Sequence, residues 1–326
     1  MLSATTIGTV MYASILVLLC VGFSFTHMME KFPNFAHISY ANIGTLFTYT
    51  LVRLMGWNPY ASWPVAALFN GLTAVGIYLL IVRPMRERGA NRIHITFAMF
   101  ALVYLLRSLM LVYSFWIMKA FGFYSGWFLL KDYDFTINGL PAIFFAAPLT
   151  SVVLVVLLHL YLTRAKFGIA IRATAEDTLL ASGLGIDTFR VHLASWFMTG
   201  AMAGLAGAAL PLWQAMDVSG NDDLMISVVA GSVLGGLDRI YGAIIGDVFL
   251  AFTQRILPIM LVKIFGLWIA SYQALIPIIV IFVVLLVEPK GILEILSRVS
   301  RWIKKRQNAL RETPPDLVLG PPLQAV

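Results

Sequence analysis

Charged residues are scarce in this chain of 326 residues: Asp, Glu, Lys and Arg together make up 12% of the sequence. Soluble globular proteins carry roughly 25% charged residues, so there is too little charge here to cover a surface that faces water. Hydrophobic residues make up 60% of the sequence, and the mean hydropathy is +0.86. These values exclude an ordinary soluble protein and indicate that lipid is the solvent for most of the chain.

Motifs of catalysis and of nucleotide binding are also missing. The single cysteine, Cys20, excludes an internal disulfide and a cysteine metal cluster, and we interpret it as a small buried apolar side chain. The sequence has no G-x-x-x-x-G-K-[ST] phosphate-binding loop, no G-x-S-x-G and no H-E-x-x-H. We therefore expect no enzyme activity, no cofactor, no resident metal and no binding of ATP by this chain itself.

What the sequence does contain is a series of long apolar runs. A helix needs about 20 apolar residues to cross the hydrocarbon core, and continuous runs favour helices over the alternating strands of a barrel. The predicted fold class is all-α: a polytopic integral membrane helical bundle with about eight full spans and one short half-span. The half-span is 224–237, and the full spans lie near 7–28, 35–55, 61–82, 93–116, 141–163, 191–213, 241–262 and 266–287.

Basic residues are concentrated in three segments. Segments 83–92, 164–190 and 288–326 hold 15 of the 23 Lys and Arg residues, whereas the loop 214–223 carries only acidic charges. Basic residues accumulate in cytoplasmic loops, which accounts for the net charge of +7 without nucleic acid as a partner. The three segments are therefore predicted to be cytoplasmic, and the N-terminus lies outside if 224–237 counts as a crossing.

The chain divides into a transmembrane domain at 1–290 and a basic, Pro-rich cytoplasmic tail at 291–326. The first apolar run has no Lys or Arg before Lys31, so it lacks the basic region of a secretory signal. We expect it to remain in the protein as a span.

The cytoplasmic segment 164–190 is long for a loop and carries its own helix signals. Residues 173–182 are predicted to form a short helix, with Thr174 as a possible N-cap and with Gly183 and Gly185 ending it. A short helix held between two spans can act as a handle through which a motor subunit moves them. An ordinary amphipathic surface loop is the alternative.

Pairs of glycines one helical turn apart recur in the second half of the chain. This spacing lets helix backbones approach closely in lipid, so it predicts close packing. The pairs are Gly200 with Gly204, Gly231 with Gly235, and Gly242 with Gly246. The double glycine Gly235–Gly236 is followed by Asp238 and Arg239, which resembles a break between half-helices whose free backbone groups can line a solute path.

Three charged residues, Arg107, Asp247 and Arg255, lie inside predicted spans. An Arg at mid-membrane costs at least ~2.5–3.5 kcal/mol, so it requires a partner or a function. Asp247 and Arg255 share a helix face, which fits an ion pair or snorkelling as well as it fits contact with a solute. The predicted solute path also includes polar groups at the opening of the second span, and its residues are Asn34, His37, Gly235, Gly236, Arg107 and Asp247.

Five motifs occur in order along residues 30–293, and together they resemble permease subunits of branched-chain amino acid ABC importers. The motifs are N-F-A-H at 34–37, R-P-M-R at 83–86, F-G-I-A-I-R-A-T-A-E-D…A-S-G-L-G-I-D at 167–187, V-L-G-G…G-A-I-I-G at 233–246 and E-P-K-G-I-L at 288–293. The segment 167–187 is the most specific of them.

The resemblance implies a multi-pass permease of the cell membrane that imports a small-molecule solute. Its partners would be a second permease subunit, similar or identical, two ATP-binding cassette subunits and an extracytoplasmic solute-binding protein. The resemblance also implies that residues 173–185 are the coupling helix. The residues expected to contact an ATPase are Glu176, Asp177, Ala181, Ser182 and Gly185.

Two departures from the family pattern leave the solute open. Ile38 follows N-F-A-H where the family usually has Gly, and Asp238–Arg239 replaces the usual small residues after the double glycine. Branched-chain or other hydrophobic amino acids are the expected solutes, and a permease of the same fold for urea, an amide or another small solute such as a sugar is the first alternative. An autonomous secondary transporter or channel is the alternative from another class.

Overall fold

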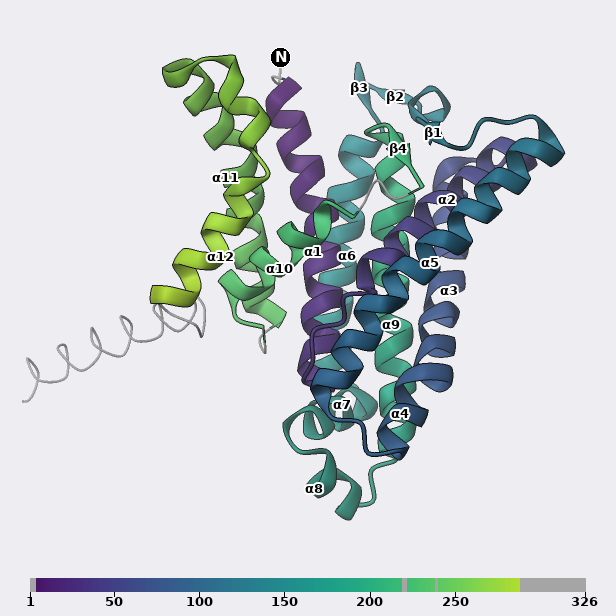
Figure 1. Cartoon of the computed structure of the whole chain (residues 1–326), viewed down its shortest axis with the longest axis vertical. Helices are drawn as coiled ribbons and strands as arrows, with labels where there is room; N and C mark the ends of the chain where they lie inside the picture. Colours follow the sequence, from purple (N-terminus) through teal and green to yellow (C-terminus); the bar gives the residue numbers. More distant parts are fainter. Residues whose placement is uncertain (1–3, 219–221, 238–239, 288–326) are drawn as a thin grey trace, which may run out of the picture.

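The computed structural model describes residues 4–218, 222–237 and 240–287, and it is a bundle of helices (Figure 1). Six helical segments in this part of the chain are long and apolar enough to cross a membrane. They contain α1 (Ala4–Glu30), α3 (Pro59–Ile77), α5 (Arg92–Phe121), α6 (Ile143–Arg164), α9 (Thr188–Ala209) and α11 (Ile240–Phe265). The predicted class, a helical membrane bundle, is confirmed.

Shorter helices complete the bundle. A π-helical turn, Tyr78–Val82, joins α3 to α4 (Arg83–Glu87). Helix α2 (His37–Met55) is as long as α3. The other short helices are α7 (Lys166–Glu176), α8 (Thr178–Gly183), α10 (Leu224–Gly235) and α12 (Leu275–Val287). Three 3-10 turns, at Lys131–Tyr133, Leu210–Leu212 and Leu267–Tyr272, lie between these helices.

Helix α2 differs from the full span predicted at 35–55. Its first residue, His37, lies beside the middle of α1, where its Nε2 atom is 3.0 Å from the carbonyl oxygen of Leu19. The chain before it returns into the bundle without helical structure, because Pro33 disfavours helix in the residue before it and has no N–H to donate. Asn34 in this segment is buried, as non-helical backbone at membrane depth must be.

The span predicted at 266–287 is also not one helix. Gly266 has a φ of 93°, which ends α11, and a 3-10 turn precedes α12. Helix α12 has 13 residues, Leu275–Val287. The predicted half-span at 224–237 corresponds to α10, which has 12 residues.

Glycines bring the central helices into contact. Helix α9 packs against α2 and α3, and a Cβ atom placed on Gly200 would lie 2.5 Å from the carbonyl oxygen of Asn70 in α3. A Cβ on Gly235 of α10 would lie 1.9 Å from the carbonyl oxygen of Gly242 in α11. One on Gly246 would lie 2.5 Å from the carbonyl oxygen of Gly231. The close packing predicted from the glycine spacing is therefore confirmed.

Four two-residue strands lie in loops at one end of the bundle, together with the N-terminus of α1 (Figure 1). They are β1 (Trp127–Phe128), β2 (Thr136–Ile137), β3 (Leu140–Pro141) and β4 (Met216–Asp217). β1 pairs with β4 and β2 with β3, both antiparallel. We call this the strand end of the bundle.

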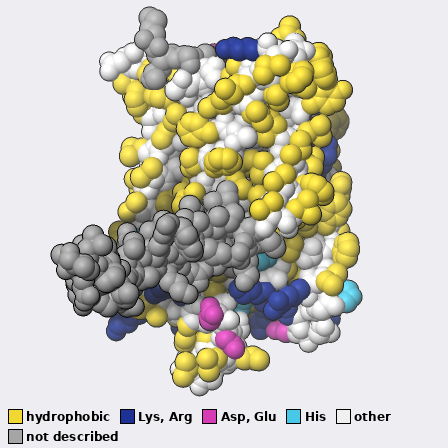
Figure 2. All heavy atoms as spheres, turned by 90° about the vertical axis from the view of Figure 1, so that its left-hand side faces the viewer, with side chains coloured by type: hydrophobic (Ala, Val, Ile, Leu, Met, Phe, Trp, Pro, Cys, Tyr) yellow, Lys and Arg dark blue, Asp and Glu magenta, His cyan; other side chains and the backbone are white. Residues whose placement is uncertain are grey.

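Helices α4, α7 and α8 lie at the opposite end, which we call the α8 end (Figure 1). Figure 2 shows a broad hydrophobic surface over the middle of the molecule and Lys and Arg side chains gathered near this lower end. The segments 83–92 and 164–190 thus share one end, as their charge predicts. The predicted tail, 291–326, lies outside the described residues.

We expect a cysteine at position 176 to react with an impermeant maleimide only from the cytoplasmic side, and one at position 132 only from outside. Glu176 and Asp132 are both exposed, and they belong to opposite ends of the bundle. Labelling of intact cells and of inverted vesicles measures this. The native Cys20 is fully buried, so the unsubstituted chain is the unlabelled control. Reaction of both positions from the same side would refute the orientation.

Candidate functional site

The segment 164–190 contains two helices where one was predicted over 173–182. Helix α7 continues to Glu176, and Asp177 is the N-cap of α8. The Asp177 carboxylate accepts hydrogen bonds from the N–H groups of Leu179 and Leu180, at 2.9 Å each. Thr174, the predicted cap, is buried inside α7. A carboxylate that satisfies two free N–H groups of a first turn explains why the helix begins at Asp177.

The side chains that project from α8 and the turn after it are apolar. Leu179, Leu180 and Leu184 are 86%, 64% and 74% exposed, and we call these three residues the leucine tip. Figure 2 shows hydrophobic side chains at the lowest point of the molecule, with Asp or Glu side chains directly above them. Exposed apolar clusters beyond the membrane mark surfaces that bind another protein.

The residues predicted to contact an ATPase lie in this same region. Glu176, Asp177, Ser182 and Gly185 are exposed, but Ala181 is only 2% exposed. The Ala181 carbonyl oxygen accepts hydrogen bonds from the N–H groups of Leu184 and Ile186, so this residue holds the turn together. The leucine tip was not predicted, because Leu179 and Leu180 were interpreted only as residues that favour a helix.

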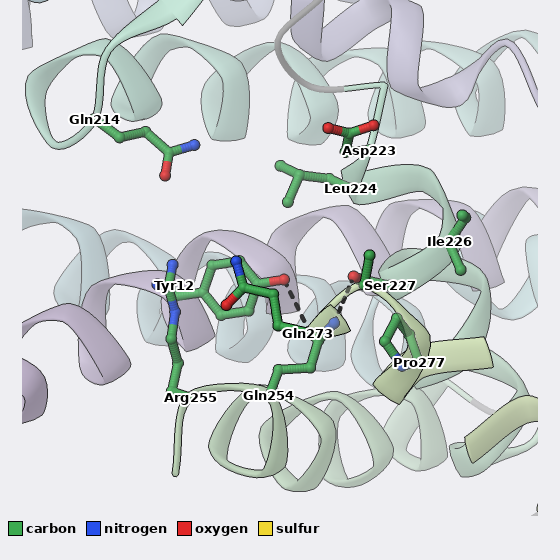
Figure 3. Close-up of a pocket in the computed structure, with 11 residues that line it drawn as sticks. Tyr12, Gln214, Asp223, Leu224, Ile226, Ser227, Gln254, Arg255, Gln273 and Pro277 are labelled. Atoms are coloured by element: carbon green, nitrogen blue, oxygen red, sulfur yellow. Dashed lines mark hydrogen bonds between the residues drawn. The ribbon is translucent and has the colours of Figure 1, made fainter. Parts of the chain in front are cut away.

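A polar pocket of about 370 Å³ lies near the strand end, between α1, α10, α11 and the start of α12 (Figure 3). Its polar lining residues are Tyr12, Gln214, Asp223, Ser227, Gln254, Arg255 and Gln273. Apolar residues, among them Leu224, Ile226 and Pro277, complete the wall. Such a volume is in the range of pockets that hold small ligands.

Hydrogen bonds tie three helices together along this pocket. The Tyr12 hydroxyl of α1 donates to Gln254 Oε1 of α11 at 2.9 Å (Figure 3). Gln254 Nε2 donates to the Ser227 hydroxyl of α10, also at 2.9 Å. The Arg255 guanidinium lies over the Tyr12 ring, 4.3 Å from its centroid. These contacts hold a polar wall in place between α1, α10 and α11.

The pocket combines one cation, Arg255, and one carboxylate, Asp223, with amide groups and an apolar wall. A zwitterion with an apolar side chain requires the same set: a donor for its carboxylate, an acceptor for its ammonium and a hydrophobic surface. The arrangement can therefore bind an amino acid. Its groups come from α1, from α10 and α11, and from the segments that flank those two helices.

None of the six residues of the predicted solute path lines this pocket in the described part of the chain. His37 is fully buried between α1 and α2, and Gly235 packs against Gly242. Gly236 has a φ of 96° and ends α10. Asp238 and Arg239, which follow, lie outside the described residues. The solute path through these positions stays a prediction.

The charged residues of the spans have separate partners. Arg107 Nη1 lies 3.5 Å from Asp222 Oδ2, and the Asn42 amide donates to Asp222 Oδ1 at 2.7 Å. The loop residue Asp222 is thus drawn between α2 and α5. Asp247 is fully buried, and its Oδ1 accepts a hydrogen bond from Cys20 Sγ at 3.0 Å.

Cys20 is therefore a hydrogen-bond donor to a buried carboxylate as well as the buried side chain that was predicted. Arg255 reaches the pocket and forms no ion pair with Asp247 in the described structure. Gln254 is the residue whose sequence context could have indicated a polar site. Burying an amide in an apolar span costs free energy unless the amide is hydrogen-bonded.

Comparison with known proteins identifies relatives of the whole chain. The sequence model of the family described as "Branched-chain amino acid transport system / permease component" matches residues 5–285. A probable branched-chain amino acid transport permease protein LivH of Methanocaldococcus jannaschii is 33% identical over 285 residues, which cover 87% of this chain and 90% of that protein.

The high-affinity branched-chain amino acid transport system permease protein LivH of Salmonella typhimurium is 25% identical, over 85% of this chain and 90% of that protein. No solved structure matches the chain significantly. The relatives and the six apolar helices identify a multi-pass protein of the cell membrane. The chain belongs to the family of permease components of branched-chain amino acid transport systems.

Proposed function

We propose that this chain is the transmembrane permease subunit of an ABC importer for branched-chain or other hydrophobic amino acids. The observation that carries the proposal is the pocket near the strand end, in which Arg255 and Asp223 face one space beside an apolar wall. The names of the relatives support the same class of solute.

In this proposal the solute's carboxylate pairs with the Arg255 guanidinium and its ammonium group with the Asp223 carboxylate. Its side chain lies against Leu224, Ile226 and Pro277. Partly exposed charges bind more weakly than buried ones, which suits a site that must release its solute inward. Further along, the solute passes the region of Gly235, Gly236 and the opening of α2, as the sequence predicts.

In this proposal, partner subunits supply the free energy for transport. The sequence has no phosphate-binding loop, so two separate ATP-binding cassette subunits supply ATP hydrolysis and dock at the leucine tip. A second permease subunit, similar or identical, completes the membrane part. An extracytoplasmic solute-binding protein delivers the amino acid to the strand end.

The test is uptake of labelled leucine by the complex reconstituted in liposomes, with and without ATP. We expect Arg255→Gln to lower uptake per assembled complex about tenfold or more, because it removes a charge-assisted hydrogen bond to the solute carboxylate. Arg53→Gln is the matched control: Arg53 lies at the end of α2 and donates to the Tyr133 hydroxyl, outside the pocket.

Three outcomes would contradict the proposal. Import of urea or an amide in place of leucine would reject the solute class. Leucine uptake without ATP or ATPase subunits would favour an autonomous transporter. Equal loss in the Arg255 and Arg53 variants would reject the pocket as the site of contact.

A further inference from the structure

A buried carboxylate at the end of α1 joins three helices at the α8 end of the bundle. Glu30 is buried, and its carboxylate forms an ion pair with Arg86 of α4. It accepts a hydrogen bond from Trp196 Nε1 of α9 at 2.7 Å, and it lies 2.8 Å from Nδ1 of His192, one turn earlier on α9. We call Glu30, Arg86, His192 and Trp196 the Glu30 network. The pocket near the strand end contains none of these residues.

The Glu30 network fixes α1 against α9 through directional contacts. A carboxylate paired with Arg86 only accepts hydrogen bonds, so His192 Nδ1 carries the hydrogen between the two side chains. Hydrogen bonds to a charged group are roughly twice as strong as neutral ones, and breaking them here would leave a buried charge without partners. The Tyr78 ring lies against the rings of His192 and Trp196, at 5.8 and 5.7 Å between centroids. The end of α1 and the start of α9 are therefore expected to move together.

Helix α9 is joined to α8 by a short turn that is itself hydrogen-bonded. The Ile186 N–H donates to the Ala181 carbonyl oxygen at 3.1 Å, and the Asp187 carboxylate caps α9 by accepting from the Arg190 N–H, also at 3.1 Å. Ile186 packs against the apolar cluster that contains Met29 of α1. A displacement of α8 therefore reaches the first turns of α9, where the Glu30 network begins.

Helix α1 connects the Glu30 network to the pocket near the strand end. It is one helix of 27 residues without proline, the residue at which helices bend most sharply. Tyr12, whose hydroxyl donates to Gln254 in the pocket, lies on this helix about 27 Å from Glu30. A shift of α1 at Glu30 therefore displaces Tyr12 relative to Gln254.

We infer that Glu30 is a positioning residue that couples the ATPase subunits at the α8 end to the pocket near the strand end. This inference rests on the proposed function. The ATPase subunits move α8, the start of α9 follows, and the Glu30 network moves α1 with α9, which changes the wall of the pocket at Tyr12. Glu30 acts through α1 and does not touch the solute.

The experiment compares two replacements of His192 in the complete complex reconstituted in liposomes. His192→Asn keeps an N–H donor near the position of Nδ1, whereas His192→Leu is of similar size and donates nothing. Coupling between two sites is commonly worth roughly 5- to 150-fold. We therefore expect His192→Leu to lower the leucine imported per ATP hydrolysed about tenfold, and His192→Asn to lower it less than about twofold. Uptake and hydrolysis, each measured per assembled complex, give this ratio.

Glu30→Gln tests the carboxylate itself, and it tests the inference independently if His192→Leu does not assemble. It keeps the shape of the side chain and removes its charge, so we expect the ratio to fall about tenfold again. Glu87→Gln is the matched control, because it removes an exposed carboxylate that pairs with Arg83 on α4 at the same end. We expect it to leave the ratio unchanged.

An unchanged ratio in His192→Leu and Glu30→Gln overturns the inference, even where both rates fall, because a purely structural network would lower hydrolysis and uptake together. Equal ratios in the two His192 variants overturn it as well. The unsubstituted complex separates this failure from that of the proposed function. If that complex imports no leucine with ATP, the proposed function fails and the inference falls with it.

Discussion

Replacing Leu179 and Leu184 with Asn is expected to abolish co-purification with the ATPase subunits and ATP-driven uptake, while the chain still inserts in the membrane. Both leucines are largely exposed, so their replacement leaves the packing of the chain itself intact. Burying each leucine in a partner's groove stabilises the complex by ~1.5–3 kcal/mol, so losing both weakens association about 10² to 10⁴-fold. Affinity capture with a tagged permease, followed by leucine uptake, measures both effects.

The matched control removes two exposed apolar side chains from the opposite end. Leu129→Asn/Phe135→Asn lies beyond the strand end of the bundle, and we expect normal co-purification with the ATPase subunits. Enlarging Ala181 is a weaker test, because Ala181 is buried and a larger side chain would distort α8 from within. Normal capture and uptake by the Leu179/Leu184 variant would show that the leucine tip is not the docking surface.

The second large effect is expected at Gly235. An alanine there would place its Cβ 1.9 Å from the carbonyl oxygen of Gly242, so α10 and α11 must separate. We expect Gly235→Ala to lower the melting temperature by about 5 °C or more, since overpacking of this kind costs ~1–3 kcal/mol or more. Cys20 reports the change, because it is buried and its Sγ contacts Val228 of α10 and Asp247 of α11. The rate at which a thiol-reactive dye labels Cys20 during heating therefore measures the separation of α10 from α11.

Gly76→Ala is the control for this prediction. Gly76 is also a helical glycine in a span, but a Cβ atom placed on it meets nothing within 4 Å. We expect its melting temperature to stay unchanged or to rise, because Ala favours a helix interior over Gly by ~0.5–1 kcal/mol. If Gly235→Ala melts like Gly76→Ala yet transports nothing, Gly235 acts in the solute path rather than in packing.

The sequence predicts the features that depend on local composition. Lipid as solvent requires long apolar runs, so six long apolar segments could be found from hydropathy alone. The shared end of the segments 83–92 and 164–190 follows from charge. The start of α8 at Asp177 could also have been predicted, because a carboxylate binds the free N–H groups of a first turn more strongly than a hydroxyl does. The prediction of Thr174 as the N-cap was therefore wrong.

The pocket could not be predicted, because it depends on tertiary contacts. Tyr12, Ser227 and Gln254 lie on three different helices and Gln273 lies in the turn before α12, and nothing in their sequence positions indicates that they meet. The return of the chain before α2 was missed for a related reason. Residues 35–55 were predicted as one span, but only the neighbouring α1 allows the non-helical segment with Asn34 to lie at that depth.

The buried Glu30 has a consequence for the order in which the protein is made. Its carboxylate is completed by Arg86 and by His192 and Trp196, which follow it by more than 160 residues. Helix α1 is therefore synthesised long before His192 and Trp196, and we expect the Glu30 carboxylate to stay hydrated until these residues reach it. The docking of α9 brings His192 and Trp196 to Glu30 and displaces this water. We therefore expect the end of α1 to pack into the bundle late, after translation has passed the middle of the chain.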